Sequence, residues 1–180
     1  MTRPAPDAPV ETPWQGRYIS VKTKGSWEYV SRPNGMRAAV ILALDEAPDG
    51  RHVILVEQYR VPLGRNCIEL PAGLVGDETA DEASFDAAQR ELEEETGYTA
   101  DHWQDAGEYY SSPGMVSESF SLFIAKGLHK VSAGGGVNDE AITVHRVKLD
   151  DLPEFLAQKR DEGAALDVRM LMLLGANFLR

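Results

Sequence analysis

The sequence predicts an α/β protein, in which strands and helices share one core. Residues 37–44 read RAAVILAL, a near-continuous apolar run typical of a strand buried on both faces. A glutamate-rich helix is predicted at 79–96, ending before Gly97 as a left-handed stop. Further strand and helix patterns follow this helix, at 119–125, 141–149, 151–158 and 164–179.

The first 35 residues are expected to differ from the rest. Residues 1–12 are rich in proline and small residues, which predicts disorder. Strands at 14–23 and 27–31 predict a hairpin, so we divide the chain into a disordered N-terminus (1–12), a hairpin region (13–35) and a main domain (36–180). A unit of two or three strands is barely stable alone. It must therefore pack on the main domain or on a second subunit.

The main domain begins with the buried strand and continues through short elements. After a turn at 45–51, the pattern predicts a returning strand, a loop, a short strand and a bend, at 52–58, 59–64, 66–70 and 71–73. Beyond the helix, residues 99–108 are predicted to be a polar connection. The segment 127–139 contains Gly134-Gly135-Gly136 and is expected to be the loosest internal segment, either a gating loop or plain disorder.

The helix carries an electrostatic problem. Four glutamates crowd its last turns, at Glu91, Glu93, Glu94 and Glu95. Like charges four residues apart repel by roughly 0.2–0.5 kcal/mol per pair. Carboxylates near a helix C-terminus also oppose the macrodipole, by about 0.3–1 kcal/mol each. A bound divalent cation is the simplest remedy.

Helical phase separates these glutamates. At 100° per residue, Phe85, Ala88 and Leu92 form the stripe that faces the core, and Glu91 and Glu95 lie at its edge. Those two glutamates are expected to be partly buried, and Glu93 to lie in water. Residues 79–82 read TADE, which predicts a capping box at the start of the helix.

Composition limits the range of functions. The 180 residues suit one domain, and a formal net charge of −11 argues against nucleic-acid and anionic-membrane partners. A phosphate substrate remains compatible with this charge if metal ions bridge the two anions. The single cysteine, Cys67, excludes an intramolecular disulfide and is expected to be a buried small hydrophobe. Without a signal-peptide core or an apolar run of roughly 18 residues, a cytoplasmic location is expected.

A motif surrounds the glutamates. Gly76, Glu82, Arg90-Glu91-Leu92, Glu94-Glu95 and Gly97-Tyr98, with their spacings, resemble the Nudix box at every fixed position. The resemblance implies the Nudix fold, a mixed sheet sandwiched between helices, here with a small N-terminal antiparallel sheet. It also implies hydrolysis of the diphosphate of a nucleoside diphosphate linked to another group, with Mg²⁺ or Mn²⁺.

The flanking segments resemble the ADP-ribose pyrophosphatase branch of that family. They are EQYR at 57–60, ELPAG at 69–73, and Ser112-Pro113-Gly114 followed by Glu118, with Pro113 placed sixteen residues after Gly97 as in that branch. The implied reaction converts ADP-ribose to AMP and ribose 5-phosphate, in a homodimer that exchanges its N-terminal sheet. Hydrolases of other nucleotide sugars, such as GDP-mannose, share much of this pattern. A third possibility is a sensor that binds a nucleotide without cleaving it, although the intact box argues against this.

The resemblance also implies roles for individual residues. Two or three metal ions would be held by the Ala72 carbonyl, Glu91 and Glu95, with Glu94 sharing. Glu140 is the preferred general base, with neighbouring Asp139 as the alternative, and Arg90 would orient the glutamates through Glu94. The residues expected to contact substrate are Arg60, Glu69, Trp27, Arg37, Gly73 and Glu118. Two of these have plainer interpretations, a surface ion pair for Arg60 and a core or interface aromatic for Trp27.

Overall fold

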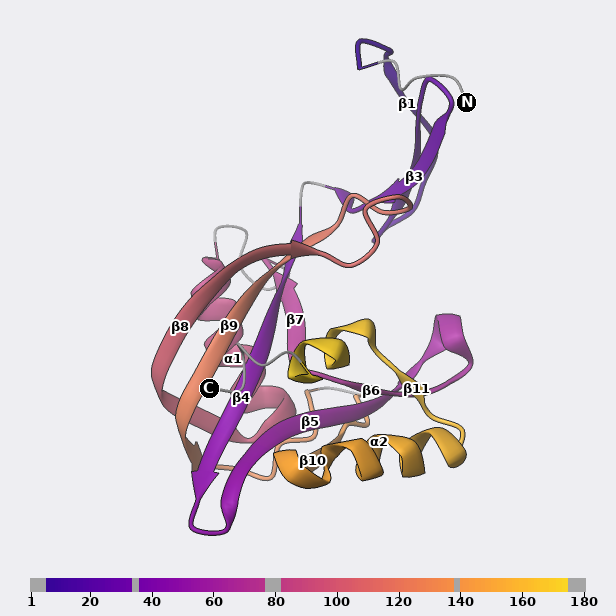
Figure 1. The fold of residues 1–180 in the computed structure, drawn as a ribbon. Coiled ribbons are helices and arrows are strands. Elements are labelled where there is room, and N and C mark those ends of the chain that lie inside the picture. The colour runs from indigo at the N-terminus through magenta and orange to yellow at the C-terminus, as the bar shows by residue number, and fades with distance from the viewer. Residues whose placement is uncertain (1–5, 34–35, 77–81, 138–139, 175–180) are drawn as a thin grey trace.

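The computed structural model describes residues 6–33, 36–76, 82–137 and 140–174, which form a small sheet and a large sheet (Figure 1). The small sheet contains β1 (Val10–Gln15), β2 (Ser20–Lys24) and β3 (Trp27–Ser31). The large sheet contains β4 (Arg37–Ala47), β5 (Gly50–Arg60), β6 (Arg65–Glu69), β7 (Ala72–Val75), β8 (Tyr98–Tyr110), β9 (Ser119–Lys130), β10 (Thr143–Lys148) and β11 (Ala165–Leu166). The helices are α1 (Ser84–Thr96) and α2 (Leu152–Asp161), with short 3-10 helices η2 (Val61–Leu63), η3 (Leu149–Asp151) and η4 (Val168–Leu174).

The large sheet is mixed and centres on β4. Its strand order is β11-β6-β5-β4-β9-β8, with β10 paired to β5 and β7 paired to β4. The β4–β9 and β11–β6 pairs are parallel, and the other pairs are antiparallel. Because β4 has neighbours along both edges, its backbone is paired in the middle of the sheet, as its continuous apolar run predicts.

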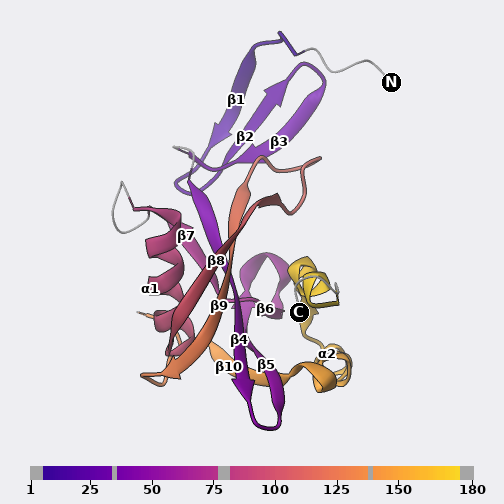
Figure 2. The same cartoon turned by 60° about the vertical axis from the view of Figure 1, so that its left-hand side comes forward.

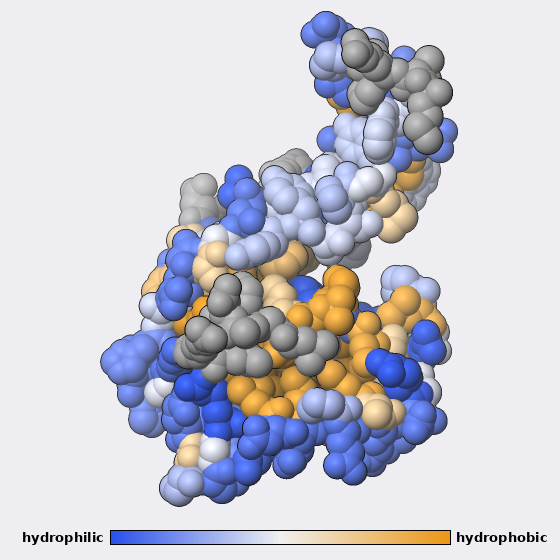
Figure 3. All heavy atoms as spheres, in the orientation of Figure 1, coloured by the Kyte–Doolittle hydropathy of each residue, from blue (hydrophilic) through white to orange (hydrophobic). Residues whose placement is uncertain are grey.

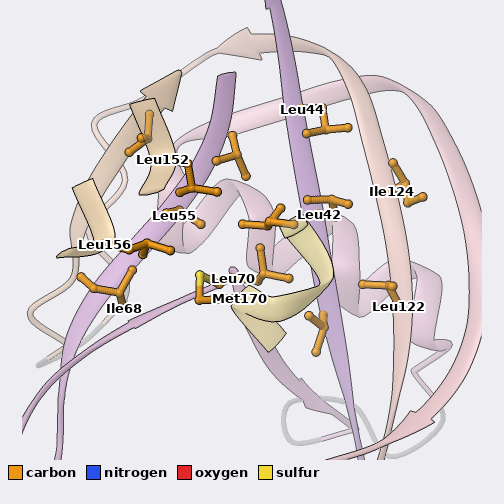
Figure 4. Close-up of a cluster of buried hydrophobic side chains, with 14 of the residues drawn as sticks. Leu42, Leu44, Leu55, Ile68, Leu70, Leu122, Ile124, Leu152, Leu156 and Met170 are labelled. Atoms are coloured by element: carbon orange, nitrogen blue, oxygen red, sulfur yellow. The ribbon is translucent and has the colours of Figure 1, made fainter. Parts of the chain in front are cut away.

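Alternate residues of β4 enter two separate cores. Val40, Leu42 and Leu44 belong to the cluster that packs against α2 and η4. Figure 4 draws most of the side chains of this cluster. Ala39, Ile41 and Ala43 belong to the cluster that packs against α1. The sheet thus lies between α1 on one face and α2 with η4 on the other (Figure 2), which confirms the predicted α/β/α arrangement.

The small sheet projects from the main body as an arm (Figures 1 and 2). Its strands are antiparallel in the order β1-β2-β3. Residues 10–12, expected to be disordered, belong to β1, and the stretch 14–23 predicted as one strand is divided between β1 and β2. The arm also touches the body, since the Val30 amide donates to the Met115 carbonyl at 2.9 Å and the Ser117 amide donates to the Val30 carbonyl at 2.9 Å.

Two predictions about elements were wrong. The predicted connection 99–108 lies within β8, the edge strand beside β9. Most of its side chains are partly or fully exposed, so the strand lacks the apolar alternation that a half-buried strand shows. In place of the predicted helix 164–179 the structure has β11 and η4, and residues 175–180 lie outside the described part. Met170 and Leu173 are nevertheless in the core, which supplies the apolar pattern that suggested a helix.

The start of α1 also differs from the prediction, but its end does not. The helix begins at Ser84, and Thr79 of the predicted capping box lies outside the described residues. The Glu82 carboxylate instead accepts hydrogen bonds from the Gly76 amide and from Arg90. Gly97 has φ +70° and donates its amide to the Glu93 carbonyl, which confirms the predicted left-handed stop.

The glycine run is bound to the end of α1. The Gly135 amide donates to the Glu95 carbonyl at 2.9 Å, and the Gly136 amide donates to the Glu94 carbonyl at 3.0 Å. Both glycines have positive φ, as does Gly134, whose added Cβ would come within 2.4 Å of the Thr96 carbonyl carbon. These glycines therefore satisfy helix carbonyls that would otherwise lack partners, so this part of the segment expected to be loosest is tied to the helix. Among the described residues, no helix is both long and apolar enough to cross a membrane.

We predict that Gly97→Ala destabilises the protein by about 1–3 kcal/mol more than Gly64→Ala. Both glycines are left-handed, with φ +70° and +64°, so each substitution carries the same backbone cost of roughly 1–2 kcal/mol. Only at Gly97 would the new Cβ also meet a neighbour, the Ser132 carbonyl oxygen at 2.3 Å; at Gly64 nothing lies within 4 Å. Urea unfolding of the two variants measures the difference, and equal losses would contradict the close approach.

Candidate active site

A cleft of about 540 Å³ is lined by residues of both α1 and η4, which lie on opposite faces of the large sheet. Its walls come from η2 and from residues of β4, β5, β6, β7 and α1. Further residues come from the segment between β3 and β4, from those just before β9 and β10, and from η4 with the residue before it. Figure 3 shows apolar side chains gathered below the arm on the η4 side of the molecule, bordered by hydrophilic surface. Charged side chains nevertheless line much of the cleft itself, which indicates a polar ligand.

One end of the cleft is a buried pair of carboxylates. Glu91 and Glu95 of α1 are 8% and 4% exposed, whereas Glu93 is exposed, as helical phase predicts. A Cβ added to Gly73 of β7 would lie 1.9 Å from the Glu91 carboxyl carbon, so any other residue there would displace this carboxylate. The neighbouring Ala72 amide donates to Glu95 Oε2 at 2.9 Å. Ala72 and Gly73, the first two residues of β7, therefore lie directly against the glutamates.

Burial makes this pair electrostatically costly. It raises the pKa of Glu95 to about 8, an effect that the Ala72 amide opposes and the nearby charges of Glu91 and Glu140 reinforce. A group that disfavours its own ionisation by this much favours a cation beside it. Such strongly shifted carboxylates in a cleft are typical of functional sites.

The donor set fits a hard divalent cation. Among the described residues, no three side chains of His, Cys, Asp or Glu are grouped as a complete metal site. Mg²⁺ does not need such a cage, since it takes one or two carboxylates and keeps several waters and substrate oxygens. Glu91 and Glu95 are two buried carboxylates of that kind, and Ala72, whose amide donates to Glu95, lines the cleft beside them.

Arg90 holds several carboxylates of the motif together. Its Nε donates to Glu82 at 3.0 Å, and its Nη1 donates to Glu91 at 2.8 Å and to Glu94 at 3.0 Å. The hydrogen bonding of Arg90 to Glu82 is the largest cause of the lowered pKa of the Glu82 carboxyl. The guanidinium thus fixes three acidic side chains, one from the segment just before α1 and two from α1 itself, and the predicted Arg90–Glu94 pair is present.

The cleft also contains Arg60 and Glu69, each of which was predicted to contact substrate. The Arg60 guanidinium grips the Glu69 carboxylate with two hydrogen bonds, at 2.6 and 2.8 Å. The Glu69 side chain is only 3% exposed, whereas that of Arg60 is 41% exposed and faces the cleft. This is therefore more than a surface ion pair, because a buried carboxylate orients a guanidinium that remains accessible.

The remaining predicted residues divide into two groups. Gly73, Glu118 and Glu140 line the cleft, and Glu140 Oε2 accepts from the Val137 amide at 3.1 Å. Asp139 lies outside the described residues. Trp27 and Arg37 do not line this cleft: Trp27 stands at the turn end of the arm, paired with Lys24, and Arg37 lines a separate recess with Tyr110. Within one chain, these two residues are therefore not placed to contact a ligand in the cleft.

The cleft also contains residues that sequence reasoning missed, Arg32, Asp167 and Arg169. Arg32 was assigned to a turn, and the other two to a helix expected to pack in the core. In the sequence, Arg32 stands in a turn before a proline, and Asp167 and Arg169 stand among apolar residues. Their charge is the only sign of a functional role. Cys67 is buried at the cleft, and burial raises the pKa of its thiol to about 12, in keeping with the expected apolar role.

Comparison with known proteins agrees with the fold and the motif. The solved structure of a protein described as an ADP compounds hydrolase shares the fold, with a TM-score of 0.62 at 23% identity over 86% of this chain and 92% of that one. The ADP-ribose pyrophosphatase of Bacillus subtilis is 34% identical over 149 residues, 81% of this chain and 76% of that protein. The GDP-mannose pyrophosphatase of Cronobacter sakazakii is 34% identical over 155 residues, 82% of this chain and 74% of that protein.

The family model described as the NUDIX domain matches residues 35–167, a range that includes the buried glutamates, the Arg90 network and the Arg60–Glu69 pair. With its fold, its motif and its relatives in agreement, this chain belongs to the Nudix family.

Proposed function

We propose that the protein hydrolyses the diphosphate bond of a nucleoside diphosphate sugar, with ADP-ribose as the preferred substrate and AMP and ribose 5-phosphate as products. The observation that carries this proposal is the single cleft that joins the buried Glu91–Glu95 pair to the Arg60–Glu69 pair. The carboxylates suit a cation-bound diphosphate, and the guanidinium suits the polar groups on either side of it. The name of the Bacillus subtilis relative supports the choice of ADP-ribose.

The proposed cofactor is Mg²⁺, with Mn²⁺ able to replace it, in two or three ions. Glu91, Glu95 and the Ala72 carbonyl would hold these ions, with Glu94 as a further ligand. When bound, they would neutralise charge on the diphosphate and lower the pKa of a water, so that it loses a proton more readily and becomes a better nucleophile towards phosphorus.

The protein's own side chains would position the carboxylates, accept a proton and bind the substrate. Arg90 keeps Glu91 and Glu94 in place through its hydrogen bonds. Glu140, at the cleft, is the proposed base that accepts the proton of the attacking water. Arg60 would donate to a phosphate oxygen or a sugar hydroxyl, since its fork is already oriented by Glu69.

One alternative has specific support. The Cronobacter sakazakii relative is named a GDP-mannose pyrophosphatase and is as similar in identity as the Bacillus subtilis one. The nucleobase and the sugar of the substrate therefore have to be decided by measurement. A sensor that binds without cleaving predicts no turnover of any nucleotide sugar, which the same measurement tests.

We further propose that the protein is a homodimer that associates through the arm. The arm has only three strands, too few for independent stability, and carries exposed large apolar side chains such as Trp14, Ile19 and Trp27. A second subunit would cover these side chains. In such a dimer, Trp27 of one subunit would reach the cleft of the other subunit.

The first test is a substrate panel of ADP-ribose, GDP-mannose and UDP-glucose, each with Mg²⁺ and with EDTA. We expect ADP-ribose to have the highest kcat/KM and EDTA to abolish turnover, measured as released phosphate after phosphatase treatment. Glu95→Gln should lower kcat at least about 100-fold, beyond the roughly 10–100-fold cost typical of groups that only orient metal ligands. Exposed Glu93→Gln is the matched control and should retain activity. Slower turnover of ADP-ribose than of the other two sugars would exclude it as the substrate.

The second test uses the pH dependence of stability. In metal-free protein, the folded state holds a proton on Glu95 up to about pH 8, whereas the unfolded chain loses it near the ordinary value of 4.5. The folded state then binds more protons, so ionisation of this group lowers stability as pH rises from about 4.5 to about 8. In EDTA, Glu95→Gln should therefore become more stable relative to the unsubstituted protein as pH rises.

Urea unfolding at pH 5, 6, 7 and 8 measures this difference, and a difference independent of pH would contradict it. Adding Mg²⁺ should stabilise the unsubstituted protein more than the variant, because ligand binding to the folded state adds to its stability.

The third test addresses the dimer. Sedimentation velocity over a range of concentrations should show a species of twice the chain mass of 19.8 kDa. Trp14→Ser should shift this species towards the monomer. Glu162→Gln, directly after α2 and remote from the arm, should not. A monomer at every concentration would exclude the proposal.

A further inference from the structure

Away from the buried glutamates, charged side chains in the cleft occur as pairs. Arg60 and Glu69 form the first pair, with two short hydrogen bonds. Arg32 and Glu118 form the second, with Arg32 Nε 2.6 Å from Glu118 Oε1. Arg32 lies just after the arm, and Glu118 just before β9, so this pair closes the end of the cleft nearest the arm.

The third pair, Asp167 and Arg169, comes from the C-terminal segment. Arg169 Nε donates to Asp167 Oδ1 at 2.7 Å, and Nη2 donates to Oδ2 at 2.9 Å, a two-point contact. The Asp167 amide donates to the Ile68 carbonyl at 3.0 Å, which ties the pair to β6. Arg169 Nη2 also reaches Glu69 Oε2 at 3.3 Å, so the pair joins the Arg60–Glu69 pair.

These pairs leave this part of the cleft without net charge. Among the described residues that line it, the three arginines Arg32, Arg60 and Arg169 are matched by Glu118, Glu69 and Asp167. Burial alone would raise the pKa of Asp167, but the hydrogen bonds from Arg169 hold it below its ordinary value, so this carboxylate is ionised. The other lining carboxylates, Glu91, Glu95 and Glu140, lie at the end assigned to cations.

An uncharged wall of paired groups has a definite chemical preference. Its carboxylate oxygens can accept hydrogen bonds from hydroxyl groups, and its guanidinium N–H groups can donate to them. A further phosphate, unlike the diphosphate, would have no cation beside it to offset its charge and would therefore need an arginine without a carboxylate partner. Each arginine that lines the cleft in the described part of the chain already has such a partner.

We propose that Asp167 and Arg169 are specificity-determining residues, which make the cleft favour a neutral, hydroxyl-rich group on the diphosphate over a group bearing an additional phosphate. This inference rests on the proposed hydrolysis of nucleotide sugars and adds the charge of the accepted sugar. The matched family range ends at residue 167, so Arg169 lies just beyond it.

The test is Asp167→Asn, which keeps an oxygen to accept from Arg169 but removes the negative charge. The probes are ADP-ribose and ADP-ribose 1″-phosphate, which differ by one phosphate on the sugar. The unsubstituted protein should prefer ADP-ribose in kcat/KM. In the variant, the ratio of the two kcat/KM values should shift towards the phosphorylated probe by about tenfold, the factor equivalent to 1.4 kcal/mol. Calorimetric affinities for both probes in EDTA should shift in the same direction.

Glu118→Gln provides a second variant, because it leaves Arg32 unmatched without altering the C-terminal segment. It should shift the ratio in the same direction. Glu162→Gln is the control, since Glu162 pairs with Lys159 on α2, outside the cleft, and the ratio should not change. If both cleft variants fold but leave both ratios unchanged, the inference is wrong while hydrolysis of ADP-ribose still supports the proposed function. If neither probe is hydrolysed or bound by the unsubstituted protein, the proposed function is wrong and this inference with it.

Discussion

The contact between β7 and α1 is the constraint on which the site depends. The Glu91 carboxylate occupies the position that a Cβ of residue 73 would take, and the Ala72 amide donates a hydrogen bond to Glu95. Two acidic side chains are thereby buried where solvent cannot screen them, against the ordinary preference of glutamate for the surface. The hydrogen bond from Arg90 to the Glu91 carboxylate and the one from the Ala72 amide to the Glu95 carboxylate offset part of this cost.

The rest of the cleft follows a different rule. Its arginines and carboxylates are brought together from segments far apart in the chain, and each positive group is matched by a negative one. Buried ion pairs of this kind contribute little net stability, because desolvation offsets their attraction. Their value here lies in orientation, since Glu69 and Asp167 fix the planes of two guanidinium groups that face the same cavity.

The sequence was informative where local rules decide the structure. Helical phase separated buried Glu91 and Glu95 from exposed Glu93, and Gly97 correctly marked the end of α1. It failed where the tertiary context decides. The strand β8 lies at an edge and is largely polar, so its period is hidden, and η4 supplies core residues without being an α-helix. Arg32 and Arg169 could not be assigned to the cleft, because nothing local indicates that a turn and a C-terminal segment meet there.

The attachment of the arm has a consequence for modularity. Val30 of the arm is hydrogen-bonded to Met115 and Ser117, and the next residues of the chain deliver Arg32 to Glu118 in the cleft wall. A shortened relative that began at Met36 would keep every fixed position of the Nudix box and still lose one side of its binding surface. The residues that form the cleft therefore extend further towards the N-terminus than the residues of the Nudix box. The arm and the catalytic body are expected to be inherited and exchanged together.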